Sequence, residues 1–171
     1  MATASRSKVH AEEQREVAEE QLVKHIDEAY AMEQNVLRML DGMISTTDDD
    51  EMRRDLERHK RETEQQAKRL KSRLEAHGAG PSMIKEAGGV LGALMKTVAD
   101  VARSDKPGRN ARDGFATEHM EIASYELLER VAKRAGDTKT AQVARQNRKE
   151  EREMARKIAH TWDKVVDQTL A

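Results

Sequence analysis

The sequence contains no cysteine, and it has little proline and few aromatic residues. The absence of cysteine excludes disulfides, thiolate zinc sites and iron–sulfur clusters, so any metal site must use oxygen and imidazole ligands. Only 2 of the 171 residues are proline and 2% are aromatic, whereas 37% are charged, a composition typical of long helices. Strand-forming residues never alternate with polar ones over a usable run, so we predict an all-α protein.

An excess of charge of either sign is also missing. The 31 basic and 32 acidic residues leave a formal net charge of −1, which provides no field to attract nucleic acid or anionic lipid. The arginine- and lysine-rich run at residues 53–73 is interleaved with acids and has no aromatic residue to stack on bases, so a solvated helix face is expected. No run approaches the ~20 apolar residues of a membrane span, and "MATASRSKVH" lacks the apolar segment of a secretory signal. We expect a cytoplasmic protein without nucleic-acid or membrane partners.

Helical periodicity defines four long segments. It predicts helices at about residues 11–44, 49–76 and 111–135, and from 139 to near the C-terminus. The ends of these helices are marked by capping residues in "STTDDDE", by the stop "HGAGP" and by the glycine in "GDT". Residues 1–10 are predicted to form a mobile tail, and residues 11–171 a single domain.

One long link, between the second and third helices, decides the topology. Within it, residues 82–104 have a helical stripe weakened by three glycines, and we predict a shorter helix that covers the end of the bundle or, alternatively, contacts a second copy. Up-and-down bundles with short loops need no such link, whereas a ferritin-like bundle needs one crossover there. We therefore predict a ferritin-like antiparallel four-helix bundle with a shorter crossover helix.

Glutamates interrupt the apolar stripes of all four helices. In "EHMEIASYELL", at residues 118–128, helical steps back from Leu128 pass through Tyr125, Glu121 and Glu118. Similar positions in the other helices hold Glu33, Glu62 and Glu151. An unpaired buried carboxylate costs several kcal/mol or takes up a proton, so a group of them requires cations. Carboxylates with a few imidazoles suit a pair of iron or manganese ions.

These segments resemble a known family, the ferritin-like stress proteins of the YciF and YciE type. The resemblance rests on "EAYAMEQNV", "HKRETEQQAKRL" and, most specifically, "EHMEIASYELL", and it covers roughly residues 22–160. It implies a ferritin-like bundle, often dimeric, with a dinuclear metal centre and a link to bacterial stress responses.

The resemblance also implies a set of metal ligands. Carried over by position, these are Glu33, Glu62, Glu118, Glu121 and Glu151, with His59 as the best nitrogen candidate. The sequence departs from other di-iron proteins in one respect, because Gln65 and Met154 stand three residues after Glu62 and Glu151, where histidines are expected. Tyr30 and Tyr125 are predicted to orient neighbouring carboxylates through their hydroxyl groups.

Several of these assignments have structural alternatives. Glu33 would reach solvent if its stripe were rotated by one position. His59 could be a satisfied core histidine, and the two tyrosines could simply fill the core. Glu150 and Glu153 compete with Glu151, while His119 is expected at the surface or behind the ligands. Glu118 and Glu121 could instead pair with arginines of a neighbouring helix, the candidates being Arg58, Arg61 and Arg69.

Two classes of function follow from these patterns. The first is a homodimeric protein that binds two iron or manganese ions and oxidises Fe(II) with a small oxidant such as oxygen or peroxide, in defence against oxidative stress. The second is a non-enzymatic stress or assembly protein with a vestigial metal site.

Overall fold

The computed structural model describes residues 2–81 and 106–170, and this part of the chain contains helices and no strand. The helices are α1 (Ala2–Thr46), α2 (Asp50–Ala76), α4 (Lys106–Ala135), α5 (Thr138–Ala159) and α6 (Trp162–Leu170). None of these helices is long and apolar enough to cross a membrane. The predicted all-α fold class is confirmed.

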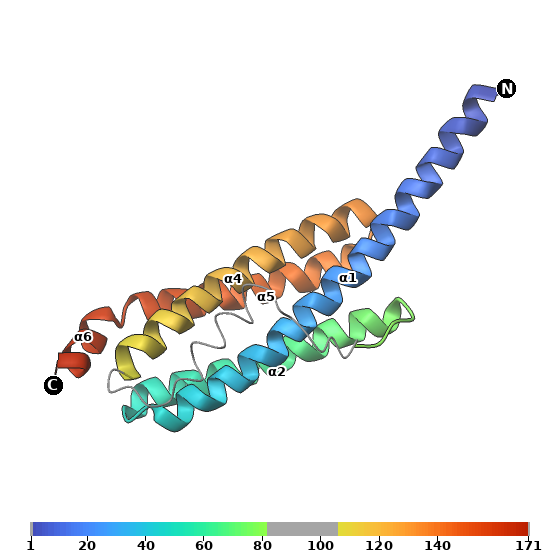
Figure 1. The fold of residues 1–171 in the computed structure, drawn as a ribbon. Helices are drawn as coiled ribbons and strands as arrows, with labels where there is room; N and C mark the ends of the chain where they lie inside the picture. The colour runs from blue at the N-terminus through green and yellow to red at the C-terminus, as the bar shows by residue number, and fades with distance from the viewer. Residues whose placement is uncertain (1, 82–105, 171) are drawn as a thin grey trace.

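The four long helices form a bundle (Figure 1). α1 packs against α2 and α4, and α5 packs against α4 and α2. The helices of each pair, α1 with α2 and α4 with α5, run antiparallel (Figure 1). α2 ends at the opposite end of the bundle from the start of α4. This placement of the helices is the one that a ferritin-like bundle with a single crossover requires, as predicted. The predicted crossover helix at 82–104 lies outside the described residues.

Three helix boundaries differ from those expected. α4 begins at Lys106 instead of near Ala111, because a proline in the first turn of a helix loses no intrahelical hydrogen bond. α1 begins at Ala2 instead of near Ala11 and extends beyond the other helices (Figure 1), since residues 2–10 contain neither glycine nor proline to interrupt it. The division of the chain into a tail and a domain stays a prediction. The fourth predicted helix is broken after Ala159, where the side chains of His160 and Thr161 bond to the last carbonyls of α5. α6 then folds back on α4, and Trp162 meets Phe115 edge to face, 5.9 Å between ring centroids.

The predicted helix ends follow the expected cap chemistry. Asp49 accepts hydrogen bonds from the first amides of α2, and Asp137 accepts one from Thr140 at the start of α5. Gly78 and Gly136 adopt positive φ angles of 69° and 78° after α2 and α4, a conformation that glycine takes without steric cost.

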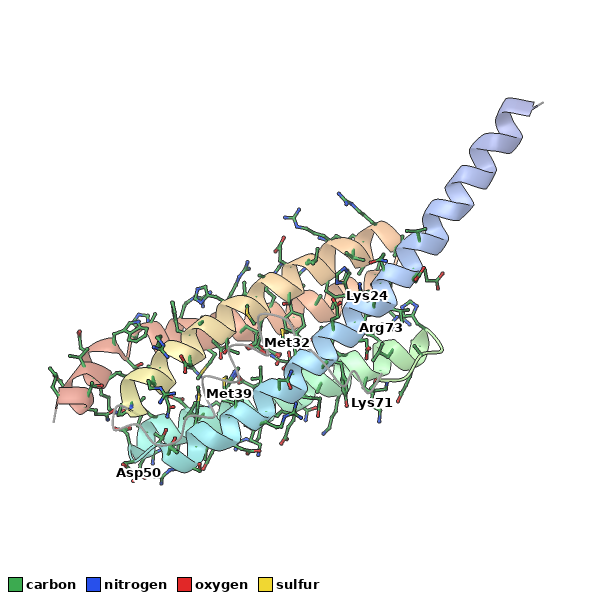
Figure 2. The ribbon with its side chains drawn as sticks, viewed as in Figure 1. Lys24, Met32, Met39, Asp50, Lys71 and Arg73 are labelled. Carbon is green, nitrogen blue, oxygen red and sulfur yellow. The ribbon has the colours of Figure 1, made fainter. Side chains whose placement is uncertain are left out.

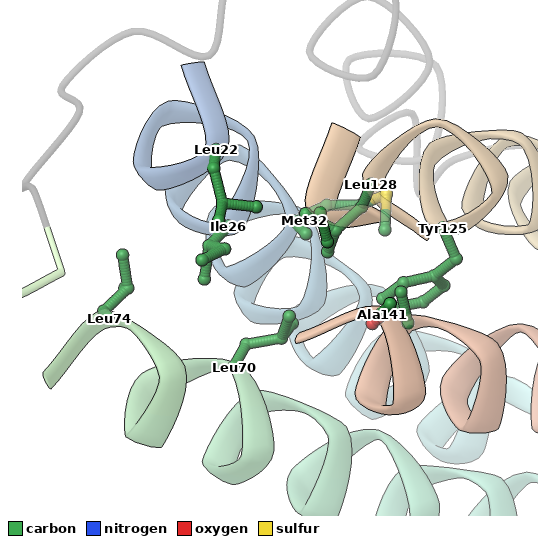
Figure 3. Close-up of a cluster of buried hydrophobic side chains, with 11 residues drawn as sticks. Leu22, Ile26, Met32, Leu70, Leu74, Tyr125, Leu128 and Ala141 are labelled. Carbon is green, nitrogen blue, oxygen red and sulfur yellow. The ribbon is translucent and has the colours of Figure 1, made fainter. Parts of the chain in front are cut away.

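The interior has three layers along the bundle axis. Charged side chains such as Lys24 and Lys71 lie on the exposed surface, whereas Met32 and Met39 are buried between helices (Figure 2). One apolar cluster, shown in Figure 3, includes Leu22, Ile26, Leu70, Leu74, Tyr125 and Leu128. A second, towards the α1–α2 turn, contains Val36, Met39, Leu40 and Met43. Between the two clusters the buried positions are occupied by polar and charged side chains.

Replacing Asp137 with alanine should destabilise the bundle. Asp137 caps α5 and also accepts hydrogen bonds from Arg73 at 2.9 Å and from His77 at 2.8 Å, so it ties the end of α2 to the start of α5. Loss of a cap and two charge-assisted contacts should lower the free energy of unfolding by about 1–3 kcal/mol. Urea denaturation would measure the loss. Asp48→Ala, at an exposed position in the α1–α2 turn, is the matched control. Equal stability of the two variants would contradict the role of Asp137 in joining α2 to α5.

Candidate metal centre

A polar layer fills the middle of the bundle, and every long helix contributes to it. α1 supplies Glu33, α2 supplies His59, α4 supplies Glu118 and Glu121, and α5 supplies Glu151, all at most 1% exposed. One ligand atom from each of four of them lies within 4.8 Å of the others, the four being His59, Glu118, Glu121 and Glu151. Three helices, α2, α4 and α5, therefore converge on a region small enough for a metal site, and α1 adds Glu33 to the same layer.

His59 lies at the centre of this layer. Its Nε2 is 3.1 Å from an oxygen of Glu118 and 3.8 Å from one of Glu151. Its Nδ1 is 3.7 Å from Glu62, whose side chain is 40% exposed and marks the outer edge of the site. Neither ring nitrogen makes a well-directed hydrogen bond. The imidazole thus lies close to carboxylates on both sides without a well-directed hydrogen bond to any of them.

A chain of hydrogen bonds holds Glu33. The hydroxyl of Tyr125 donates to Glu33, and the amide of Asn147 donates to that hydroxyl at 3.0 Å. Arg69 donates to the carbonyl oxygen of Asn147 at 2.6 Å. The link from half-buried Arg69 to buried Glu33 fixes the direction of the carboxylate, which is how residues behind a metal site orient its ligands.

Gln66 fixes Glu151 in a similar way. Its amide nitrogen donates to Glu151 and, at 3.1 Å, to Glu150. Glu150 forms an ion pair with Arg69 at 2.9 Å. Glu150 thus points outwards to an arginine, while its neighbour Glu151 points inwards to His59.

Many polar atoms of this layer have no partner. One oxygen each of Glu33, Glu118 and Glu151, and both oxygens of Glu121, are buried without a hydrogen bond. A buried polar atom left unsatisfied costs about 1–3 kcal/mol, and a charged one costs more. Such atoms are usually paired with protein or water, so this layer has an unmet demand for protons, water or a cation.

Burial and mutual repulsion perturb the acidities. Burial raises the pKa of Glu33 to about 8, against the opposing effect of the Tyr125 hydrogen bond. Burial, followed by the charge of Glu151, raises the pKa of Glu121 well above its usual range. Burial and then Glu118 do the same for the pKa of Glu151. Without cations this layer therefore retains protons at neutral pH.

For His59, the attraction of neighbouring carboxylates outweighs the effect of burial on its pKa. Burial alone would lower its pKa, but the adjacent Glu118 and Glu151 carboxylates raise the pKa well above 6.5. In return, His59 lowers the pKa of Glu62. In the absence of metal the imidazole is thus the cation that the surrounding carboxylates share.

The structure brings together most of the residues singled out in the sequence. Glu33, His59, Glu118, Glu121, Glu151 and Tyr125 meet in one layer, with Glu62 at its margin. Tyr30 does not join them, because the buried stripe of α1 passes through Ala29 and Val36, and Tyr30 packs instead against the apolar cluster. The sequence assigned no role to Gln66 and Asn147, and it offered Arg69 and Glu150 only as alternatives, not as the pair that supports the layer. The signal for Gln66 and Asn147 was a polar residue on an apolar stripe beside a glutamate.

The other side chains that could have neutralised or replaced these carboxylates are engaged elsewhere or exposed. Arg58 pairs with Asp55, and Arg69 pairs with Glu150, so neither neutralises Glu118 or Glu121. Glu153 is exposed. His119 is exposed as well, and its ring bonds to the carbonyl of Phe115 at 2.9 Å, away from the carboxylates.

Four antiparallel helices around a buried carboxylate and imidazole cluster define a ferritin-like helical bundle. Residues 17–171 match the sequence profile of the family described as "Domain of unknown function (DUF892)", and the chain belongs to that family.

Solved structures with similar folds extend this comparison. A protein from Xanthomonas campestris pv. campestris is 29% identical, with 90% of this chain and 96% of that one covered and a TM-score of 0.75. The E. coli stress protein YciF is 19% identical, with coverage of 88% and 97% and a TM-score of 0.76. A Desulfovibrio desulfuricans bacterioferritin, which has a diiron site, is 17% identical, with coverage of 90% and 84% and a TM-score of 0.73. The last two likenesses show the fold alone.

The metal-free protein should become less stable as the pH rises. Glu33, Glu121 and Glu151 bind their protons more tightly in the folded chain than in the unfolded one, where the pKa is 4.5. At pH values between the unfolded pKa and the raised folded pKa, the folded state binds more protons than the unfolded state. The free energy of unfolding therefore falls as the pH increases. His59 acts in the same direction, since its folded pKa exceeds 6.5. In chelator, the melting temperature should therefore fall from about pH 5 to pH 8. A flat or rising profile would contradict a buried, unneutralised carboxylate layer.

Glu121→Gln should stabilise the metal-free protein at neutral pH. Both oxygens of Glu121 lack partners and its raised pKa is due first to burial, so a neutral amide removes the cost of keeping a proton there. The gain in melting temperature should be clear at about pH 8 and small at about pH 5, where the carboxyl group is protonated in any case. Calorimetry at the two pH values would test this. A stabilisation that is equal at both would mean that packing, not charge, is responsible.

Proposed function

We propose that this protein binds two divalent metal ions, iron or manganese, in the polar layer between its four helices. The observation that carries the proposal is the set of five buried carboxylate oxygens without a hydrogen-bond partner in one polar layer, three of whose glutamates lie beside His59. Four buried carboxylates carry a formal charge that two divalent cations would balance. With neutral His59, the donors would be hard oxygens and one imidazole, a set that suits iron or manganese and excludes soft-metal chemistry.

The residues fit such a group at named positions. Glu118, Glu121, Glu151 and His59 would hold the ions, because they already lie within 4.8 Å of one another. Glu33 is directed into the layer by Tyr125 and would complete the set from α1. Glu62 is half-exposed at the margin, 3.7 Å from His59, and is the remaining carboxylate close enough to join the set. Each binding event would release the protons that the raised pKa values retain, so metal affinity should increase with pH.

The reaction we infer is oxidation of Fe(II). A bound iron pair would supply one-electron chemistry towards dioxygen or peroxide. The protein's part is to hold the carboxylates through Tyr125 and Gln66 and to exclude bulk water with the apolar clusters on both sides. A site rich in carboxylates stabilises ferric over ferrous iron, so we expect slow or single-turnover oxidation. A place among the YciF-type stress proteins and a homodimer are part of this proposal and rest on sequence resemblance. A cytoplasmic location is also part of the proposal.

Metal analysis of the protein purified without chelator is the decisive experiment. The parent should carry about two metal ions per chain, as ferritin-like di-metal proteins do. Glu121→Ala should remain folded but lose at least half of the bound iron and oxidise Fe(II) under air about tenfold more slowly. Glu153→Ala, on the exposed face of α5, is the control and should match the parent.

The opposite results would support the structural alternative. A parent chain that binds neither iron nor manganese, or an alanine variant that oxidises iron as fast as the parent, would mean that this layer is not a working metal centre. The bundle would then act through assembly or partner binding.

A further inference from the structure

An apolar cavity of about 60 Å³ opens at the end of the bundle that contains the α1–α2 turn. All four long helices contribute to its walls, which include Met39 and Met43 of α1, Leu56 of α2, Gly114 of α4, and Met154 and Ile158 of α5. Its lining also includes the polar, partly exposed residues Thr47, Asn110 and Thr161. The cavity is thus lined mainly by apolar side chains, with a few polar ones that reach the surface.

The cavity ends at the candidate metal centre. Glu118, whose carboxylate lies 3.1 Å from His59, is part of its lining, and Met154 lies three positions after Glu151 on the same face of α5. The side chains of Asp55 and Lys157, which also line the cavity, lie 3.9 Å apart and neutralise each other. Glu118 is therefore the one lining carboxylate, among the described residues, that faces the metal centre.

We infer that this cavity binds dioxygen and gives it access to the metal centre at Glu118. The inference rests on the proposed function and deepens it by naming the oxidant. Apolar cavities of around 150 Å³ admit benzene or xenon, so one of about 60 Å³ is of a size for a diatomic molecule. The polarisable thioethers of Met39, Met43 and Met154 provide dispersion contacts to such a ligand.

The same walls discriminate against the other reactants. Hydrogen peroxide would lose hydrogen bonds to water and find few replacements among thioethers and aliphatic groups, which costs several kcal/mol per unmet group. A hydrated Fe(II) ion would lose far more. The chemistry served by this access is the transfer of one electron from each of two Fe(II) ions to dioxygen, which takes up two protons and leaves as hydrogen peroxide.

Gly114 offers a means of filling the cavity without touching the proposed ligands. A Cβ atom built there would meet Ile158 at 3.5 Å and Met43 at 3.8 Å, both ordinary contacts, so Gly114→Ala fits the helix. Gly114→Leu would place a larger side chain within the cavity. Gly42→Leu is the matched control, since a Cβ at Gly42, on the exposed face of α1, meets nothing within 4 Å.

One readout of the test, the binding of xenon in crystals, does not depend on iron. Crystals of the parent pressurised with xenon should show a xenon atom beside Met43 and Gly114, absent from Gly114→Leu and retained in Gly42→Leu. Stopped-flow oxidation of Fe(II) should then be at least tenfold slower with dioxygen in Gly114→Leu, with iron stoichiometry unchanged. With hydrogen peroxide as oxidant, the rate should stay within about twofold of the parent. Gly114→Ala should show a smaller effect in the same direction.

The results separate this inference from the proposed function. If iron binds and is oxidised but xenon does not occupy the cavity, or if Gly114→Leu reacts with dioxygen as fast as the parent, the inference is wrong and the proposed function stands. If the parent carries no metal while xenon occupies the cavity, the proposed function fails, and the role in oxygen access fails with it. Equal slowing with dioxygen and peroxide would overturn the assignment to dioxygen, because it would indicate general damage to the site.

Discussion

The burial of four carboxylates around a single imidazole is the constraint on which the rest of this structure depends. Glu33, Glu118, Glu121 and Glu151 are removed from water, yet His59 is the only cation in direct contact with them among the described residues. An arrangement of this kind opposes folding unless protons or metal ions neutralise it. Proteins tolerate such a cost where it serves function, because strain and repulsion at a site can be offset by packing elsewhere.

The remainder of the bundle supplies that packing and fixes the geometry of the layer. One apolar cluster lies on each side of it, and the outer ends of the ligand-bearing helices are held by Asp49, Asp137 and their partners. Arg69 connects the layer to the surface through Asn147 on one side and Glu150 on the other. A metal ion arriving at this site would therefore find carboxylates already oriented, which lowers the reorganisation needed for binding. The methionine-lined cavity beyond Glu118 adds an apolar approach that the hydrogen-bonded side of the layer lacks.

The sequence predicted the class of fold and most of the layer, and the reasons are local. Long amphipathic periods, aspartate caps and glycine stops determine helices nearly independently of tertiary contacts, and a single long link allows few topologies. Glutamates at core positions of the stripes identified the buried carboxylates of the layer. The sequence determined less well which face of α1 points inwards. The buried stripe of α1 passes through Ala29 and Val36, so Tyr30 lies outside the layer. Gln66 and Asn147 were not assigned roles, because their partners lie on other helices, 85 and 22 residues away, and spacing within one helix cannot reveal them.

The most direct measurement of the central claim is anomalous diffraction from crystals grown with Fe(II) or Mn(II), recorded on both sides of the metal absorption edge. The account predicts two anomalous peaks inside the polar layer, at about 2.0–2.2 Å from oxygens of Glu118, Glu121 and Glu151 and from a nitrogen of His59, distances typical of divalent metals with carboxylate and imidazole ligands. The oxygens that lack partners would be the ones that coordinate. A map with no anomalous peak in this layer, and with the carboxyl groups hydrogen-bonded to one another through shared protons, would contradict it.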